Sequence, residues 1–193
     1  MPFDRPYAKL FDALVYTVHD CGCIARCAKE SDDGSQVRLE KLYGIIEESR
    51  FGIHDLSRVT LDRENRLPRF NMPLELGIFL GAKRYGSPRQ KRKAMLILEK
   101  EPYRLAKFCS DLAGQDPRAH GNDLQRAITI VRNWLRTERS GVPDVPGGAA
   151  IALRYFQFRR DLPGMCELRQ LNVRDLTFLD YRTLVEGWLD AHQ

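Results

Sequence analysis

Short apolar runs alternate along this chain with longer segments of helical periodicity, and this alternation limits the fold more than any other feature of the sequence. The runs at residues 13–18, 51–57 and 94–99 are rich in β-branched, aromatic and aliphatic side chains, which is typical of buried strands. In the segments around them, apolar residues recur at intervals of three and four, which is typical of amphipathic helices. Strands separated by helices form βαβ units, so the sequence predicts an α/β fold with a mostly parallel sheet.

The helical segments and one linker predict how the chain is divided. Residues 140–148 are rich in Gly and Pro, which are typical of a linker. We therefore expect an α/β domain over residues 1–140 and a mainly helical extension over residues 141–193 that packs on the same domain. The expected helices span residues 24–29, 37–46, 71–85 and 124–135, and a last helix has Asp175 or Thr177 as its N-cap.

Composition excludes several classes of protein. The chain has 193 residues, of which 43% are hydrophobic and 30% charged, as in ordinary globular proteins. No run approaches the roughly 18 consecutive apolar residues of a membrane-spanning helix, and the first residues do not resemble a secretion signal. We therefore expect no membrane association and a cytoplasmic location. The odd number of cysteines, five, agrees with free thiols in a reducing compartment.

The excess of basic residues is local. Lys and Arg total 31 and Asp and Glu total 26, which gives a formal charge of +5. Six basic residues lie between Lys83 and Lys93, and without them the count is 31 − 6 = 25 basic against 26 acidic residues. We interpret this run as a solvated face that complements a helix dipole, far from the substrate edge of the sheet. Nucleic-acid binding is not expected, because the chain has no recognised DNA- or RNA-binding motif.

Three cysteines close together suggest a metal site at first sight. Cys21, Cys23 and Cys27 can be combined with His19 as ligands, but they lack paired C-x-x-C spacing and no second pair follows. We therefore expect no metal and no cofactor, and we interpret these cysteines as small buried side chains.

Ligands of open parallel sheets bind beyond the carboxyl ends of the strands. The first expected strand ends at His19 and Asp20, and the second ends at His54, Asp55 and Ser57. We therefore expect these polar side chains to line a substrate crevice. The loop that follows carries four arginines, Arg58, Arg63, Arg66 and Arg69, of which Arg58 and Arg69 are the candidates for contact with a phosphate.

Glu75 is the principal candidate for catalysis. Asn71 suits the N-cap of the next helix and Pro73 suits its first turn, so Glu75 lies about one turn inside that helix and close to the crevice. In a structural interpretation, its carboxylate only complements the positive end of the helix dipole. In a catalytic interpretation, Gly77 and Gly81 leave room for a ligand, and the carboxylate stabilises or captures an oxocarbenium-like sugar cation.

A segment rich in turn-forming residues follows the third expected strand. It carries Asp111, Asp116 and His120, and loops in this position often contain functional residues. These three side chains are candidates to contact ribose hydroxyls or to transfer a proton. The alternative is that the Asp and Gly residues here only form turns and helix caps.

Residues 52–57, a loop, residues 71–82 and the strand at 94–98 together resemble the core of the nucleoside 2-deoxyribosyltransferase and Toll/interleukin-receptor (TIR) group. In that group, a strand ending in Asp or Ser precedes a helix that carries the catalytic Glu in a context such as E-[LI]-G-x-A. The resemblance covers roughly residues 13–99. The segment at 109–120 fits neither branch, which marks the chain as a divergent family of the group.

The resemblance implies a flavodoxin-like three-layer sandwich that cleaves an N-glycosidic bond, in a deoxynucleoside for one branch and in NAD for the other. Glu75 matches the catalytic Glu, and Asp55 matches the strand-end acid of the transferase branch. The arginine-bearing loop favours NAD as substrate, and the group's habit of self-association implies a homo-oligomer. The alternative is a non-catalytic module that binds a nucleotide or self-associates in signalling without turnover.

Overall fold

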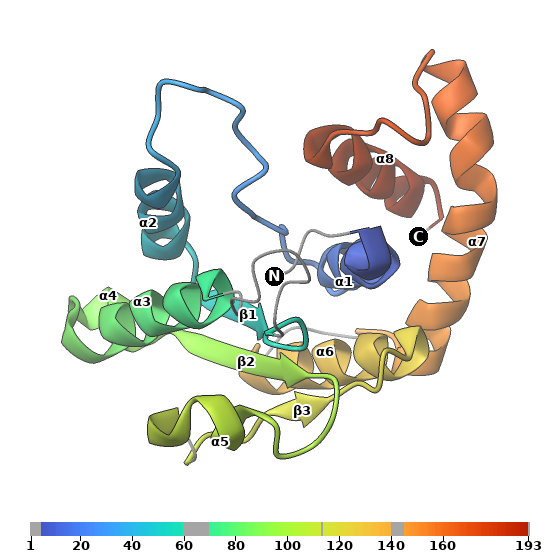
Figure 1. Ribbon diagram of the computed structural model, residues 1–193. Helices are drawn as coiled ribbons and strands as arrows, with labels where there is room; N and C mark the ends of the chain where they lie inside the picture. Colours follow the sequence, from blue (N-terminus) through green and yellow to red (C-terminus); the bar gives the residue numbers. More distant parts are fainter. Residues whose placement is uncertain (1–4, 60–69, 113, 140–144, 193) are drawn as a thin grey trace. The chain divides into compact units, whose positions relative to one another are not determined.

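The structure, a computed structural model, consists of two compact units (Figure 1). The sheet unit comprises residues 1–11 and 34–123, and the helical unit comprises residues 12–33 and 124–193. The boundary expected at residue 140 is not observed, because the helix before it groups with the C-terminal helices. The structure describes residues 5–59, 70–112, 114–139 and 145–192.

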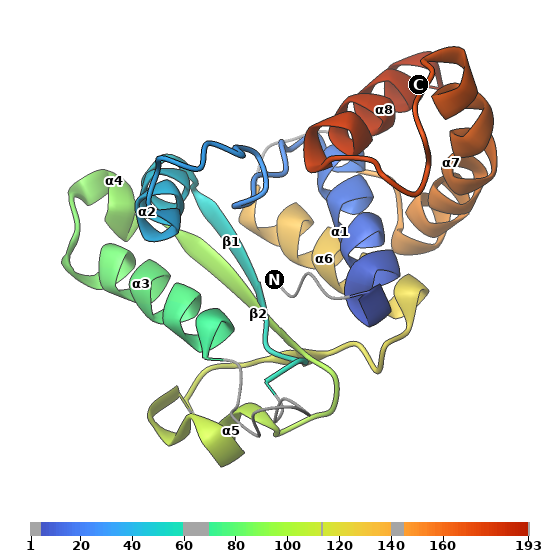
Figure 2. The ribbon, with the colours of Figure 1, turned by 45° about the horizontal axis from the view of Figure 1, so that its top comes forward.

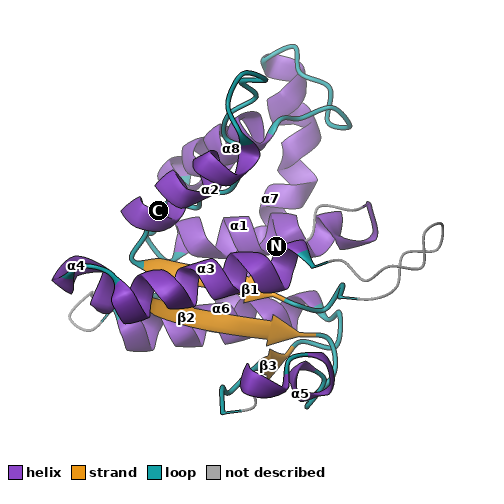
Figure 3. Cartoon of the chain, turned by 60° about the vertical axis from the view of Figure 1, so that its left-hand side comes forward, coloured by secondary structure: helices purple, strands orange, loops and turns teal. Residues whose placement is uncertain are grey.

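The sheet unit is built on three parallel strands in the order β1-β2-β3, drawn as orange arrows in Figure 3. β1 (Phe51–Asp55) and β2 (Ala94–Glu99) confirm two of the expected strands, and β3 (Arg118–Ala119) is a short strand that the sequence did not predict. A small, entirely parallel sheet joined by helices places this unit in the α/β class. In the ladder, Phe51 pairs with Ala94, Asp55 with Leu98, and Leu98 with Arg118.

α3 (Asn71–Tyr85) connects β1 to β2 and runs beside these two strands (Figure 2). Its bounds match the helix expected over residues 71–85. Leu74 is 54% exposed, so the helix buries one stripe and not most of its circumference. The core between this stripe and the sheet consists of Leu56, Val59, Met72, Leu76, Ile97 and Leu105.

α2 (Arg38–Glu48) confirms the helix expected over residues 37–46 and packs beside α3. Part of the basic run covers its carboxyl end. The Lys93 ammonium donates hydrogen bonds to the carbonyls of Ile46 and Ser49. These contacts satisfy helix-end carbonyls that have no partner inside the helix, so the run caps α2. The shorter helices of this unit are η1 (Arg5–Tyr7), α4 (Pro88–Lys91), α5 (Leu105–Phe108) and η2 (Ser110–Leu112).

The strand expected at residues 13–18 is wrong, because these residues belong to the helix α1 (Ala8–Asp20). Every side chain from Ala13 to Thr17 is 2% exposed or less. A short segment that is buried on all sides has no periodicity by which to distinguish a helix from a strand. The helix expected over residues 24–29 is also wrong, since that segment consists of loop and turns.

The helical unit also contains three long helices. α6 (Leu124–Glu138) and α8 (Phe178–Ala191) confirm expected helices, and α8 begins with a capping box between Thr177 and Asp180. α7 (Gly148–Leu168) was not expected, because Pro163 lies inside it. None of the helices that the structure describes is long and apolar enough to cross a bilayer. Tyr16, Tyr155, Phe158 and Trp188 form the aromatic centre of this unit.

Two glycines test the packing of α3 on β1. A Cβ on Gly52 would lie 2.8 Å from Cε2 of Phe79 and 2.9 Å from Nε2 of His54. We expect Gly52→Ala to lower the free energy of unfolding by about 1–3 kcal/mol, because a packed ring must move. A Cβ on Gly77, in α3 itself, meets no atom within 4 Å. Gly77→Ala should therefore raise the free energy of unfolding by about 0.5–1 kcal/mol through helix propensity.

Urea unfolding followed by circular dichroism measures both glycine substitutions. Effects of the same sign and size would contradict the close approach of α3 to β1.

Candidate functional site

The carboxyl end of β1 carries a fully buried carboxylate. Asp55 is 0% exposed, and its Oδ2 accepts a hydrogen bond from the Tyr7 hydroxyl at 2.5 Å. Its Oδ1 accepts a hydrogen bond from the backbone N–H of Ser57 at 2.8 Å. Nε2 of His120 lies 3.1 Å from Oδ2. One carboxylate therefore joins η1, the turn after β1 and the segment that follows β3.

A neighbouring backbone group fixes the ring of His120, which is itself 0% exposed. The backbone N–H of Asn122 donates to Nδ1 at 2.9 Å, so Nδ1 is the acceptor and the neutral ring carries its proton on Nε2, facing Asp55. Nε2 is not aligned for a hydrogen bond with any described residue, so its approach to Asp55 is an electrostatic contact. Asn122 has φ of +60°, a conformation that Asn adopts more readily than most residues.

The contacts around Asp55 keep it ionised. Burial by itself raises the pKa of a carboxyl group, but His120, Ser57 and Tyr7 outweigh this effect and hold the pKa of Asp55 below its ordinary value. Asp55 is therefore a charged group in the interior at neutral pH.

Asp55 and Glu75, the two predicted catalytic residues, belong to opposite sides of the sheet. His54 faces α3, with its ring centroid 5.2 Å from that of Phe79. Side chains alternate along a strand, so Asp55 faces away from α3. Glu75 is half-buried in the second turn of α3. The two residues therefore do not form a pair of neighbouring catalytic carboxylates.

The turn held by Asp55 nevertheless connects to α3 through packing. The Asp55–Ser57 hydrogen bond fixes the chain as it leaves β1. The residues next to this turn enter the core on the α3 side of the sheet. Asp55 thus stabilises the turn against which the first residues of α3 pack. The apolar residues of this contact are Leu56, Val59, Met72 and Leu76.

The residues around the start of α3 differ from expectation in one respect. Phe70 occupies the N-cap position and makes no side-chain capping hydrogen bond, so the predicted cap at Asn71 is wrong. Asn71 is itself the first helical residue, because the helix begins one position earlier than its polar side chain suggests.

Ser57 is buried, and its hydroxyl makes no hydrogen bond with a described residue. Arg58 is half-buried, whereas Arg63, Arg66 and Arg69 lie outside the described residues.

The three candidates at residues 111–120 separate in the structure. Asp111 is exposed in η2. Asp116 is exposed and forms an ion pair with Arg118 at 2.9 Å. Of the three, His120 is the one that contacts Asp55.

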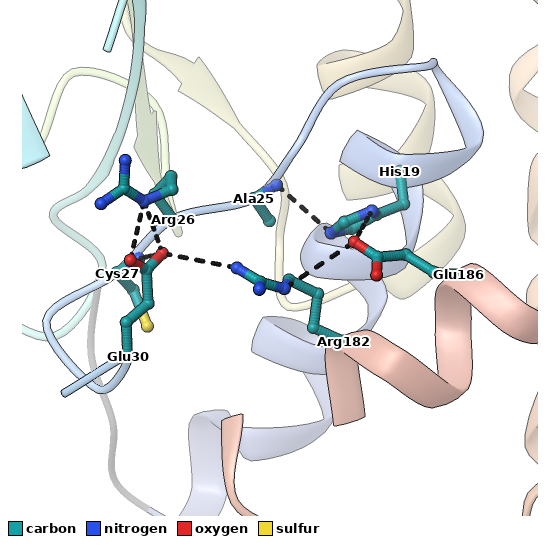
Figure 4. Close-up of polar contacts among 7 residues, drawn as sticks. All are labelled: His19, Ala25, Arg26, Cys27, Glu30, Arg182 and Glu186. Atoms are coloured by element: carbon teal, nitrogen blue, oxygen red, sulfur yellow. Dashed lines mark hydrogen bonds and ion pairs between the residues drawn. The ribbon is translucent and has the colours of Figure 1, made fainter. Parts of the chain in front are cut away.

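His19 and Asp20 lie at the end of α1 in the helical unit, so their predicted place at a strand end is wrong. The error follows from the helix at 13–18. Nε2 of His19 accepts the N–H of Ala25 at 3.2 Å, and its Nδ1 lies 3.5 Å from Glu186 (Figure 4). Burial and then the Arg182 charge lower the pKa of His19 to about 4, so the ring is neutral at pH 7. Asp20 forms an ion pair with Arg154 at 3.2 Å.

The contacts of His19 continue into a network that holds the loop after α1 to α8. Arg182 lies 3.7 Å from Glu186 and 3.9 Å from Glu30. Glu30 in turn binds Arg26 at 2.7 Å (Figure 4). Since each member is matched by a charge or hydrogen bond of the same unit, we interpret this network as a structural anchor.

The cysteines near this network are not activated as nucleophiles. Burial raises the pKa of Cys21 to about 12 and that of Cys27 to about 11. Among the described residues, no group of three or more His, Cys, Asp or Glu side chains is arranged to hold a metal ion.

Three functional candidates were missed in the sequence. Glu99 is buried at the end of β2, and its Oε2 accepts the N–H groups of Arg104 and Leu105 at 3.1 and 3.0 Å. The strand-end rule that selected Asp55 would also have selected Glu99. Tyr7 and Asn122 gave no signal, because their roles arise from contacts made only in the folded chain.

The structure so far defines an α/β unit in which an ionised, buried carboxylate fixes the end of a strand, and α3 carries a half-buried Glu in its second turn. Comparisons with protein-family models, with curated proteins and with solved structures found no match to this chain. The functional argument therefore rests on the residues of the site.

Replacing Asp55 by Asn should lower stability most at neutral pH. The pKa of Asp55 is lower in the folded than in the unfolded chain, so its contribution is complete above the ordinary Asp value and is lost as the pH falls through the folded-state pKa. We expect Asp55→Asn to lower the free energy of unfolding by about 3 kcal/mol at pH 7. Denaturant unfolding between pH 7 and pH 3 should show this difference shrinking towards the acid end.

The matched control is Asp116→Asn, which removes an exposed ion pair and should change the free energy of unfolding by less than about 0.5 kcal/mol. An Asp55→Asn difference that stays constant down to pH 3 would argue against an ionised Asp55.

Proposed function

We propose that the sheet unit cleaves or transfers at the N-glycosidic bond of a nucleotide, with NAD as the favoured substrate, and that it does so within a flavodoxin-like arrangement. The observation that carries the proposal is the β1–α3–β2 crossover, which starts α3 at the carboxyl edge of a parallel sheet with Glu75 in its second turn. This edge is where parallel sheets bind ligands. The resemblance of the same segments to the deoxyribosyltransferase and TIR group supports the assignment.

Glu75 is the catalytic residue of this proposal. When the bond between the ribose C1′ and the base breaks, the base leaves with the electron pair and positive charge develops on the ribosyl ring. The Glu75 carboxylate stabilises that charge or bonds to C1′. Water or another acceptor then attacks C1′ and loses its proton, and the carboxylate is released.

Asp55 and His120 act as positioning residues in this reaction. Both are 0% exposed, and each is held by other groups of the chain, so neither touches the substrate. Their contribution is a rigid strand end and turn against which α3 packs. A Glu held in this way loses little conformational freedom on meeting the substrate.

Two other side chains at this edge suit a nucleotide. Arg58 follows the turn after β1 and offers a cation to a phosphate. Tyr103, in the loop after β2, is 85% exposed and has φ of +63°. A bulky residue in this strained conformation is a feature of functional loops, and its ring offers a face on which a base can stack.

The proposal includes a cellular setting. All five cysteines are free thiols, which supports action in the reducing cytoplasm. We also propose a homo-oligomer as the active form, in keeping with the resemblance.

Glu75→Gln should abolish turnover and leave the fold intact. We expect the rate of nicotinamide release from NAD to fall by at least about 100-fold, because the amide cannot offset a developing positive charge. Chromatography of the products measures the rate, and circular dichroism verifies folding. Glu101→Gln, whose carboxylate is exposed in the loop after β2, is the matched control and should retain wild-type turnover.

Release of base by Glu75→Gln at the wild-type rate would refute the role of Glu75. Calorimetry with NAD and ADP-ribose distinguishes the alternative: binding by the wild-type protein without any turnover would identify a nucleotide-binding module.

A further inference from the structure

A cationic pocket lies at the amino edge of the sheet unit, where β1 and β2 begin. Its volume is about 240 Å³, and it is lined by the end of α2, the residue before β1 and the segment from α4 to β2. Figure 2 shows α2 and α4 next to each other at this end of the strands. Four basic residues line it: Arg50, Arg89, Arg92 and Lys93.

The charges in this pocket are not balanced. Four basic side chains face two carboxylates, those of Glu47 and Glu48, so the lining carries an excess of 4 − 2 = 2 positive charges. Burial and the nearby charge of Arg89 lower the pKa of Lys93, which is 3% exposed. The cations therefore repel one another, and a bound anion would offset this repulsion.

Capping of α2 explains some of these residues but not all. Lys93 and Gln90 donate hydrogen bonds to carbonyls at the end of α2. Arg89 reaches the Glu48 carbonyl only at 3.5 Å, and the guanidinium of Arg92 makes no ion pair or hydrogen bond within the described part of the chain. The guanidinium of Arg50 lies over the Phe51 ring, 5.1 Å from its centroid.

We propose that this pocket binds a phosphate group carried by a small molecule. The forked guanidinium groups of Arg89 and Arg92 suit the oxygens of a tetrahedral oxyanion. Oε1 of Gln90 is buried and has no hydrogen-bond partner among the described residues, so it can accept a hydrogen bond from the P–OH group of a singly protonated phosphate. A pocket of this volume with an acceptor at its wall fits a small phosphate better than the backbone of a nucleic acid.

The pocket is separate from the crevice of the proposed reaction. It adjoins the first residues of β1, whereas Asp55 is the last residue of that strand. Five residues of extended chain separate the two ends by roughly 13 Å. The inference therefore does not rest on the proposed function, and its test leaves the role of Glu75 unaffected.

Calorimetry with inorganic phosphate and with glycerol 3-phosphate, in 150 mM sodium chloride, tests the pocket. We expect both to bind, and we expect Arg92→Ala to weaken binding by about tenfold through loss of a charge-assisted hydrogen bond. Lys91→Ala is the matched control, because Lys91 is exposed in the same run but does not line the pocket. It should change the affinity less than twofold, and Arg92→Lys should recover part of the loss.

Stronger binding of the ester than of inorganic phosphate would identify the substituted phosphate as the ligand. Equal binding would show that the pocket recognises the free anion, and would overturn the assignment of a small-molecule ester. Equal losses of phosphate affinity in Lys91→Ala and Arg92→Ala would overturn the proposal. They would show that the anion responds to the general positive charge of this region and not to a defined pocket. The absence of binding at 10 mM phosphate, or a preference for duplex DNA that both variants weaken equally, would overturn it as well.

Discussion

The buried carboxylate of Asp55 is the interaction on which the sheet unit depends. A charge in the interior is stable only where polar groups of the protein replace the water that it loses. Here the Tyr7 hydroxyl, the Ser57 N–H and the His120 ring meet that requirement from three separate segments. The same contacts tie the N-terminal segment and the chain after β3 to the end of β1, so satisfying one charge also fixes the edge of the sheet at which the proposed reaction takes place.

The two ends of β1 have different chemistry. At the carboxyl end, the ionised Asp55 is held by polar groups of the interior, and Glu75 lies half-buried in the second turn of α3. At the amino end, basic residues cap α2, and Arg50 and Arg92 exceed what capping requires. Part of the local excess of positive charge in the sequence therefore caps α2. The basic residues that capping does not use support the proposal of a phosphate pocket.

Much of the sheet unit could be predicted from the sequence, because local pattern and tertiary environment agree there. β1, β2 and α3 lie where their apolar periodicity indicated. α1 could not be predicted, because a segment buried on all sides has no periodicity to read. In the site, Asp55 and His120 were both selected, but their contact was not, and Tyr7 lies 48 positions from its partner. Strand alternation, which separates Asp55 from Glu75, became visible only once the register of β1 was known.

The most direct test of this account is the titration of Asp55 itself. Carbon-13 NMR of its side-chain carboxyl group between pH 7 and pH 2 reports ionisation without any substitution. The account predicts a midpoint below the ordinary Asp value of about 3.9, because Tyr7, Ser57 and His120 together outweigh burial. A midpoint above that value would contradict the account, since burial would then dominate and the strand end would not be stabilised by an ionised Asp55.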